Sequence, residues 1–279
     1  MNNSAISWLI RLLKGIFIGA GFIVPGMSGG ALMAVLGLYE QAITFIANIT
    51  KDFRQNFFFF LPVGLGGVAG IFIFSVFLSF FFEVAEVQLI WFFIGCIVGT
   101  LPTLWAQAGS KGRKSSHLAI LVLSFLIAFS FLNYISHTVG GSLPLNTLTW
   151  VMTGGLMGLS SIIPGLSTSN LLLFLQLYAP MTQGIANLDF GVIIPIGIGG
   201  VASVLVFSRF MVFLFTRAYS ALFHAILGFV IASTILIVPF DYDYFSLNGL
   251  LSAGTAILGI FMGAWMCSLE NKKPTKSSR

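Results

Sequence analysis

The stretch IIPGLSTSNLLLFLQLY, residues 162–178, interrupts an apolar run with a Pro-Gly pair followed by Ser, Thr, Ser and Asn. A similar stretch, IVPGMSGGALMAVLGLY, occupies residues 23–39, which is 139 positions earlier. Both contain the pattern Pro-Gly-x-Ser, and both end in Leu-x-Leu-Tyr. The chain therefore uses one motif twice, each time at a break in a hydrophobic segment.

The composition around these motifs is that of a membrane protein. Of the 279 residues, 57% are hydrophobic and 8% are charged, and the mean hydropathy is +1.02. Soluble domains carry about 25% charged residues. Long apolar runs that contain glycine favour transmembrane helices over barrel strands. The sequence thus predicts an all-α polytopic membrane protein with no soluble domain of useful size.

A second pair of stretches extends the repeat. LPVGLGGVAGIFIF at residues 61–74 aligns with IPIGIGGVASVLVF at residues 194–207. Glycines and prolines recur in order across the two alignments, at Gly15/Gly154, Gly19/Gly158, Pro25/Pro164, Gly26/Gly165, Pro62/Pro195, Gly66/Gly199 and Gly67/Gly200. Apolar bias alone does not align such residues, so we expect a duplication. The two copies are residues 1–138 and 139–279, in one membrane domain.

Each copy is expected to hold a helical hairpin broken at the Pro-Gly motif, followed by three transmembrane helices. The expected helices cover 57–82, 88–105 and 117–135 in the first copy, and 190–215, 220–238 and 247–267 in the second. The broken pair adds an even number of crossings, whether it is re-entrant or fully spanning. Each copy then crosses the membrane an odd number of times, so the second copy is expected to be inverted relative to the first.

The charged residues agree with this topology. If the N-terminus is cytoplasmic, the basic residues fall on the cytoplasmic side: Arg11, Lys14, Lys51, Arg54, Lys111, Arg113, Lys114, Arg217, Lys272, Lys273, Lys276 and Arg279. The opposite side receives Glu83, Glu86, Asp189, Asp241 and Asp243. We therefore expect both termini in the cytoplasm. The net charge of +5 then reflects membrane topology rather than binding to nucleic acid.

The Pro-Gly pair gives a physical reason for the break. Proline cannot extend the preceding helix, glycine permits unusual dihedral angles, and a following Ser or Thr can cap the next helix. The expected hinge residues are Pro25, Gly26, Pro164 and Gly165. Two helix N-termini aimed into the membrane would attract an anion. The candidate anion ligands are Ser28, Gly29, Gly30, Ser167, Thr168 and Ser169. A plain proline kink packed against neighbouring helices is the alternative.

Two charged residues are candidates for function inside the membrane. Arg209 is expected about seven residues, or roughly 10 Å, inside the cytoplasmic end of its helix. A charge at that depth is costly and marks a candidate substrate ligand, although a side chain reaching back to the interface is the alternative. The equivalent residue in the first copy is Val76. Glu40 is either an interfacial residue or a proton-coupling group, and Ala179 replaces it in the second copy.

No metal or other cofactor is expected. His117, His137 and His224 are scattered without the spacing of metal ligands. Cys96 and Cys267 fall in apolar helical stretches, where an unpaired thiol is more common than a disulfide.

Four stretches of the chain resemble the bacterial polyprenyl-phosphate transporter family. They are GIFIGAGFIVPGMSGGALMAVLGLYE, FFIGCIVGTLP, PIGIGGVASVLVFSRF and GGLMGLSSIIPGLSTSNLLLFLQLY. The resemblance implies a non-enzymatic protein of the bacterial plasma membrane that translocates undecaprenyl phosphate, the spent lipid carrier of cell-wall synthesis. Protons are a possible coupling partner.

The chain departs from the family pattern at two places. Phe22 stands where relatives usually carry an acidic residue, and Thr168-Ser169 replaces a common Gly-Ser. If the usual acid carries protons, this chain must couple differently or use another residue.

Two other functions remain open at this point. Broken-helix termini would serve a small or amphipathic carboxylate as readily as a phosphate, so a transporter of another anion is one alternative. A membrane lipid phosphatase is the other, because His137 lies in the polar stretch SHTVGGSLPLN. That chemistry needs a His or Asp relay and clustered basic residues, which do not accompany His137.

Overall fold

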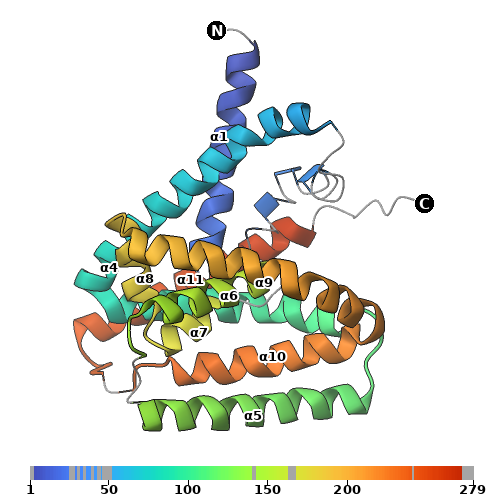
Figure 1. The fold of residues 1–279 in the computed structure, drawn as a ribbon. Coiled ribbons are helices and arrows are strands. Elements are labelled where there is room, and N and C mark those ends of the chain that lie inside the picture. Colours follow the sequence, from blue (N-terminus) through green and yellow to red (C-terminus); the bar gives the residue numbers. More distant parts are fainter. Residues whose placement is uncertain are drawn as a thin grey trace.

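The computed structural model describes residues 3–24, 29, 32–33, 36–38, 41–42, 45, 52–139, 143–162, 168–240 and 242–271. The elements are α1 (Asn3–Ile23), α4 (Phe53–Gly109), α5 (Ser115–Val139), α6 (Thr147–Ile162), α7 (Thr168–Phe174), α8 (Tyr178–Ala186), α9 (Phe190–Arg217), α10 (Tyr219–Leu236) and α11 (Leu247–Asn271) (Figure 1). Six of these helices are long and apolar enough to cross a membrane. The structure thus confirms the predicted polytopic all-α membrane protein.

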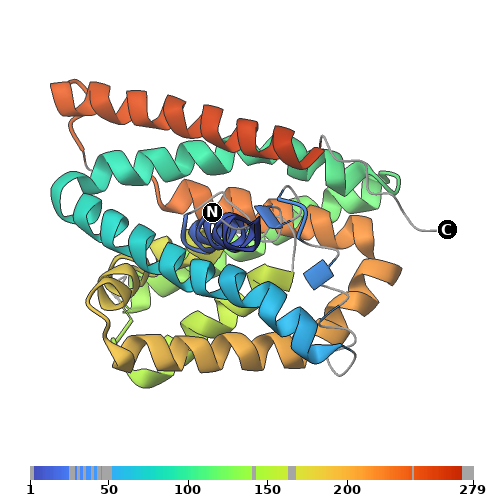
Figure 2. The same cartoon turned by 90° about the horizontal axis from the view of Figure 1, so that it is seen from above.

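The longest element, α4, consists of two helices joined at a sharp bend. A straight helix of its 57 residues would be about 85 Å long, far more than the roughly 30 Å of a hydrocarbon core. Ala85 has non-helical angles, φ −153° and ψ 46°, between the two halves. Figure 2 shows the chain turning back on itself there. The bend separates the predicted segments 57–82 and 88–105, so both are confirmed.

The remaining predicted segments are confirmed as α5, α9, α10 and α11. Helices at aligned positions of the sequence run in opposite directions (Figure 2). In Figure 2, the N-terminal half of α4 ends at the side where α9 begins, and the C-terminal half of α4 begins at the side where α10 ends. Helix α1 lies at a steep angle to these helices, since it stands upright in Figure 1 and is seen end-on in Figure 2.

Three helices follow the broken hairpin in each copy. The third of these packs on the second of these in the other copy. Helix α11 packs against α4, and α5 packs against α10. Both interfaces use a glycine at an equivalent position. A Cβ atom added to Gly95 would lie 2.1 Å from the Ala256 carbonyl oxygen, and one added to Gly228 would lie 2.3 Å from that of Leu121. Helices from the two halves of the sequence are therefore interleaved rather than merely side by side.

The α1–α4 pair and the α6–α9 pair also cross at aligned glycines. A Cβ atom on Gly15 would lie 2.2 Å from the carbonyl oxygen of Val63, in the α1–α4 pair. Gly154, which aligns with Gly15, stands in the same relation to Ile196 in the α6–α9 pair, at 2.0 Å. Small residues allow such close approach of helix backbones within membranes. Both copies thus build one crossing geometry from the same glycines.

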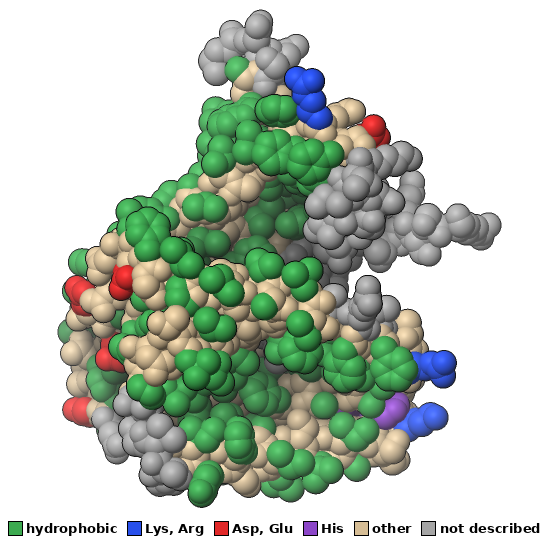
Figure 3. Space-filling model, in the orientation of Figure 1, with side chains coloured by type: hydrophobic (Ala, Val, Ile, Leu, Met, Phe, Trp, Pro, Cys, Tyr) green, Lys and Arg blue, Asp and Glu red, His purple; other side chains and the backbone are tan. Residues whose placement is uncertain are grey.

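Charged side chains gather at opposite ends of the long helices. Acidic residues flank the bend at Ala85 and precede α9 and α11, whereas basic residues follow α4 and end α9. Figure 3 shows red side chains at the left edge and blue ones at the lower right, with further blue and red side chains near the top. Arg11 and Lys14 instead bind backbone carbonyl groups, at Phe59 (3.1 Å) and Leu36 (2.8 Å). These two cations, expected to be plain topological anchors, also tie α1 to neighbouring segments.

Candidate functional site

Both repeated motifs lie where a helix ends. Helix α1 ends at Ile23, two residues before Pro25, and α6 ends at Ile162, two residues before Pro164. Helix α7 then begins at Thr168. The predicted breaks therefore coincide with observed helix ends. Several predicted residues lie outside the described part of the chain: Pro25, Gly26, Ser28, Gly30, Glu40, Pro164, Gly165 and Ser167.

After each break the two copies form the same tight turn. Gly37 and the aligned Gln176 both adopt positive φ angles, 75° and 56°. The next residues, Leu38 and Leu177, donate backbone hydrogen bonds of 2.9 and 2.8 Å to carbonyl groups five residues earlier. This arrangement is typical of a helix C-terminus with a left-handed residue, a conformation that suits glycine better than glutamine. The turn is thus retained in the second copy despite the less suitable residue.

Gly29, one of the predicted anion ligands, lies against an aromatic ring. A Cβ atom at this position would come within 2.7 Å of the Phe22 ring. Phe22 is the residue that replaces the acid expected from the family pattern, and its side chain is 40% exposed. An apolar ring, rather than a carboxylate, therefore borders the first motif in this protein.

The second motif continues into a buried helix. Thr168 begins α7, and its side chain is outside the described set. Ser169 is buried, and Asn170 is completely buried. Helix α7 contacts α6, α8 and α10, so it lies within the helix assembly. Ser169 was predicted as a ligand from the sequence, whereas Asn170, the last residue of the same polar stretch, was not.

Tyr178 connects the second copy to the break of the first. Its hydroxyl group donates a hydrogen bond to the carbonyl oxygen of Ile23, the last residue of α1. Its ring lies 5.7 Å from the ring of Phe82 and 5.6 Å from that of Phe93, between centroids. A helix end leaves carbonyl groups without intrahelical partners, and this hydroxyl satisfies one of them. Sequence analysis used Tyr178 only to align the repeat and missed this contact.

Arg209 lies on α9, near the end of that helix at Arg217. Its side chain is outside the described residues, so its role as a ligand of the substrate stays a prediction. Helix α9 packs along α6, the helix that ends at the second break. In the first copy, the equivalent Val76 is 44% exposed on α4.

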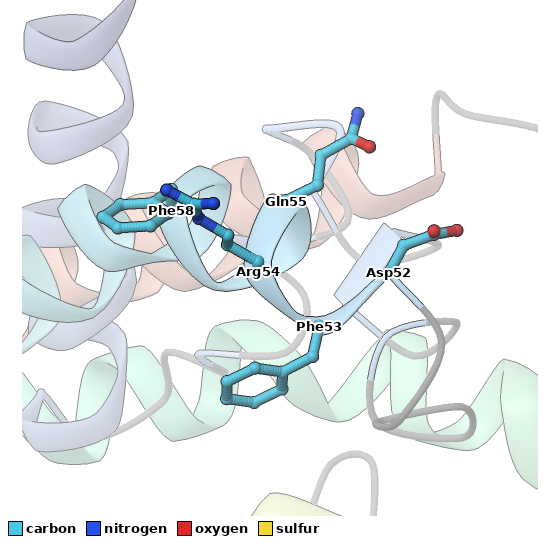
Figure 4. A pocket seen from close by; sticks show the side chains of 5 residues that line it. All are labelled: Asp52, Phe53, Arg54, Gln55 and Phe58. Carbon is cyan, nitrogen blue, oxygen red and sulfur yellow. The ribbon is translucent and has the colours of Figure 1, made fainter.

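An open hollow occurs at the start of α4, away from the predicted site residues. It is lined by Asp52, Phe53, Arg54, Gln55 and Phe58. Figure 4 shows that their side chains fan out from the first turns of the helix rather than converge on one point. All five residues are exposed, which is unlike a site that surrounds a ligand.

The histidines and cysteines of the described part form no cluster of three or more potential metal ligands with acidic residues. His117 and His224 lie near one another, with ring centroids 5.5 Å apart. The buried His224 hydrogen-bonds through Nδ1 to the carbonyl oxygen of Ser220, at 2.6 Å. One ring nitrogen of His224 is therefore hydrogen-bonded to the backbone of α10, the helix that contains this histidine.

Comparisons with known proteins identify the family of this chain. The family model described as VCA0040-like, undecaprenyl phosphate translocase-like, matches residues 18–247. A polyprenyl-phosphate transporter of Staphylococcus aureus is 26% identical over 243 residues, covering 82% of this chain and 86% of the relative. A polyprenyl-phosphate transporter of Vibrio cholerae is 26% identical over 236 residues, covering 78% and 73%. Comparison with solved structures gave no significant match. The chain belongs to the undecaprenyl phosphate translocase-like family.

Proposed function

We propose that this protein translocates undecaprenyl phosphate across the bacterial plasma membrane, so that the lipid carrier of cell-wall synthesis is recycled. The observation that carries the proposal is the family match over residues 18–247, together with two relatives named polyprenyl-phosphate transporter. The polytopic helical fold is suited to moving a lipid and differs from that of a soluble carrier. In this proposal the protein moves its substrate and performs no chemical reaction on it.

The proposed transport unit is a pair of inverted repeats, residues 1–138 and 139–279. Three structural features support it: the opposite directions of corresponding helices, the matched glycine crossings, and the exchange of third helices between copies. Inverted repeats place a substrate site at their interface near the middle of the membrane. Both termini are then cytoplasmic. Labelling of a cysteine introduced at Lys111 by a membrane-impermeant reagent, applied outside intact cells, would contradict this orientation.

The proposed anion site lies where the two broken hairpins meet. Its ligands are Ser28, Gly29, Gly30, Ser167, Thr168, Ser169 and Arg209. Support comes from the helix ends at Ile23 and Ile162, from the repeated turn that follows each break, and from the contact of Tyr178 with Ile23. That contact joins the start of α8, after the second break, to the end of α1, before the first break.

Inward movement of the head group requires a driving force. A phosphate monoester carries about −1.5 to −2 charges at neutral pH. Each charge moved against a potential that is negative inside costs about 2.3 kcal/mol per 100 mV. Moving the head group against 100 mV therefore costs roughly 3.5 to 4.6 kcal/mol. Uptake of one or two protons would cancel much of that cost. We propose proton coupling with Glu40 as the leading carboxylate, since Phe22 occupies the usual acidic position.

Transport of labelled undecaprenyl phosphate in liposomes that contain only this protein tests the proposal. We expect movement between leaflets that protein-free liposomes lack, and faster inward movement when the outside is acidic. The potential and the pH gradient should be imposed separately. If the transport rate depends on neither the potential nor the pH gradient, proton coupling is excluded. The movement is then passive and driven by consumption of the carrier. Transport of inorganic phosphate or a small carboxylate, without the lipid, would favour a small-anion transporter instead.

A further inference from the structure

Asn170 is a buried polar residue whose side-chain amide is entirely unpaired. Its exposed fraction is 0%, and neither Nδ2 nor Oδ1 has a hydrogen-bond partner among the residues that the structure describes. A buried amide that lacks partners destabilises the folded state, because it has lost its hydrogen bonds to water without gaining others. Each such group in a folded protein calls for an explanation, and a bound ligand, an ion or an ordered water molecule can supply the missing partners.

Asn170 differs from the other buried polar groups of the described helices. Ser233 and Thr234 on α10, for example, both donate to the carbonyl oxygen of Val230, 3.1 and 2.6 Å away. Several other buried residues leave one side-chain atom unpaired, including the hydroxyl groups of Thr153 and Ser203. Within the described part, Asn170 is the residue with two unpaired buried side-chain polar atoms, a donor nitrogen and an acceptor oxygen.

The position of Asn170 connects this unpaired amide to the second motif. It follows Thr168 and the buried Ser169 in α7, the helix that begins directly after the second break. Helix α7 lies among α6, α8 and α10. The aligned residue of the first copy is Ala31, which has no polar side chain. The unpaired amide is therefore present at one of the two breaks and absent from the other.

We propose that Asn170 binds the phosphate head group of the lipid and selects a phosphate monoester. This inference rests on the proposed function. An amide offers N–H donors and a carbonyl acceptor, so it is complementary to a ligand that also has both. A monoprotonated phosphate monoester has both: its charged oxygens accept from Nδ2, and its P–OH group donates to Oδ1. The second pKa of such a monoester is near 6, so the monoprotonated form is populated near neutral pH.

Other anions match the amide less well. A carboxylate and a phosphate diester present only acceptor oxygens at neutral pH, so each would leave Oδ1 unpaired in the buried site. Sites that hydrogen-bond a ligand group discriminate strongly against analogues that lack it, because the buried partner is then left unsatisfied. Asn170 therefore accounts for selectivity as well as for affinity.

Two substitutions separate a binding role from a structural one. Asn170→Leu has a similar volume and removes the unpaired amide, so thermal stability in detergent should be equal to or higher than that of the wild type. Binding of a polyprenyl monophosphate should fall at least tenfold. Asn170→Asp removes the N–H donors and should weaken binding at least as much. Thr153→Val is the matched control, since it removes another unpaired buried hydroxyl group, on α6, and should leave affinity unchanged.

The decisive measurement compares affinities for a polyprenyl monophosphate and its methyl diester in wild type and in Asn170→Leu. The wild type should prefer the monoester at least tenfold, and the variant should lose most of that preference. Unchanged affinity and preference in Asn170→Leu would overturn the inference while leaving the proposed function intact. If that variant does not fold, unchanged binding by Asn170→Asp would overturn it equally. A wild type that binds neither lipid would instead remove the proposed function itself.

Discussion

The two copies of the repeat share a backbone frame but differ in their polar side chains. The α1–α4 and α6–α9 crossings use aligned glycines, and both hairpins contain the same left-handed turn. At other aligned positions the first copy has Lys14 and the second has a buried, unpaired Thr153. In the sequence alignment, Asn170 and Arg209 of the second copy correspond to Ala31 and Val76 of the first. Glu40 of the first copy corresponds to Ala179. The two copies therefore share the frame and the cap serines, while several other groups suited to bind charge occur in one copy only.

The largest expected effect comes from filling the crossing points. A Cβ atom at Gly66 would lie 2.1 Å from the Leu12 carbonyl oxygen, and one at Gly199 would lie 1.9 Å from that of Val151. Because backbone atoms cannot move aside locally, we expect Gly66→Ala and Gly199→Ala each to destabilise the fold by at least about 2 kcal/mol. The measurement is the melting temperature and the monodisperse fraction in detergent.

Aligned glycines supply the controls for that experiment. A Cβ atom at Gly64 or Gly197 would have no atom of another described helix within 4 Å. Gly64→Ala and Gly197→Ala should therefore leave the melting temperature unchanged or raise it slightly, since alanine favours helix. A large loss in one copy and none in the other would show that the two crossings are not energetically equivalent.

Substitution of Arg209 tests the asymmetry in charge. We expect Arg209→Ala to reduce transport of undecaprenyl phosphate at least tenfold, and Arg209→Lys to restore it only in part, because lysine lacks the bidentate guanidinium. The initial rate in proteoliposomes at equal protein content is the measurement. Arg217→Ala, at the end of the same helix, is the control and should have little effect. Full activity of Arg209→Ala would eliminate Arg209 as a ligand.

Removal of the Tyr178 hydroxyl tests the contact between the copies. Tyr178→Phe leaves the Ile23 carbonyl without this donor in a buried place, so we expect a loss of about 1–2 kcal/mol in stability. Thermal unfolding in detergent measures it. Tyr242→Phe is the comparison, because that hydroxyl group lies in a partly buried contact with Gln88, 3.3 Å away. Equal effects of the two substitutions would show that the Ile23 contact has no special weight.

The smallest expected effect comes from the two cap serines. Ser28→Ala and Ser167→Ala should each weaken transport about fivefold, which corresponds to the roughly 1 kcal/mol of a lost helix cap. Protein abundance should remain close to that of the wild type. Transport rate per molecule, measured for each variant and for the double variant, compares the copies directly. Loss from Ser167→Ala alone would place the site on the second copy.

The sequence predicted the helices well because their signals are local. Apolar length located both halves of α4 and the helices α5, α9, α10 and α11, and the Pro-Gly breaks located the helix ends at Ile23 and Ile162. Helix partners were not predicted, since every lipid-facing or buried face is apolar and the composition does not distinguish them. The spacing of small residues was an available signal: Gly15 and Gly19, like Gly154 and Gly158, lie four apart and face the partner helix.

The polar site was harder to predict than the frame. Serine, threonine and arginine near the breaks were selected because their chemistry suits an anion. Burial separates Asn170 from other polar residues, and the hydroxyl of Tyr178 gains its meaning only from Ile23, 155 positions away in the chain. Such properties depend on tertiary packing, which no short stretch of sequence contains.

The packing of α5 on α10, a helix of the other copy, has a consequence for biosynthesis. Helix α5 ends at Val139, but α10, on which it packs, begins only at Tyr219. Translation proceeds at about 5–20 residues per second, so α5 waits on the order of ten seconds after its own synthesis for its partner. During that interval, lipid or the insertion machinery must cover the face that contains Leu121 and Ser124, which later meet Gly228 and the Ala225 carbonyl group. The nascent first half of the chain is therefore an incomplete membrane protein until most of the second half has been inserted.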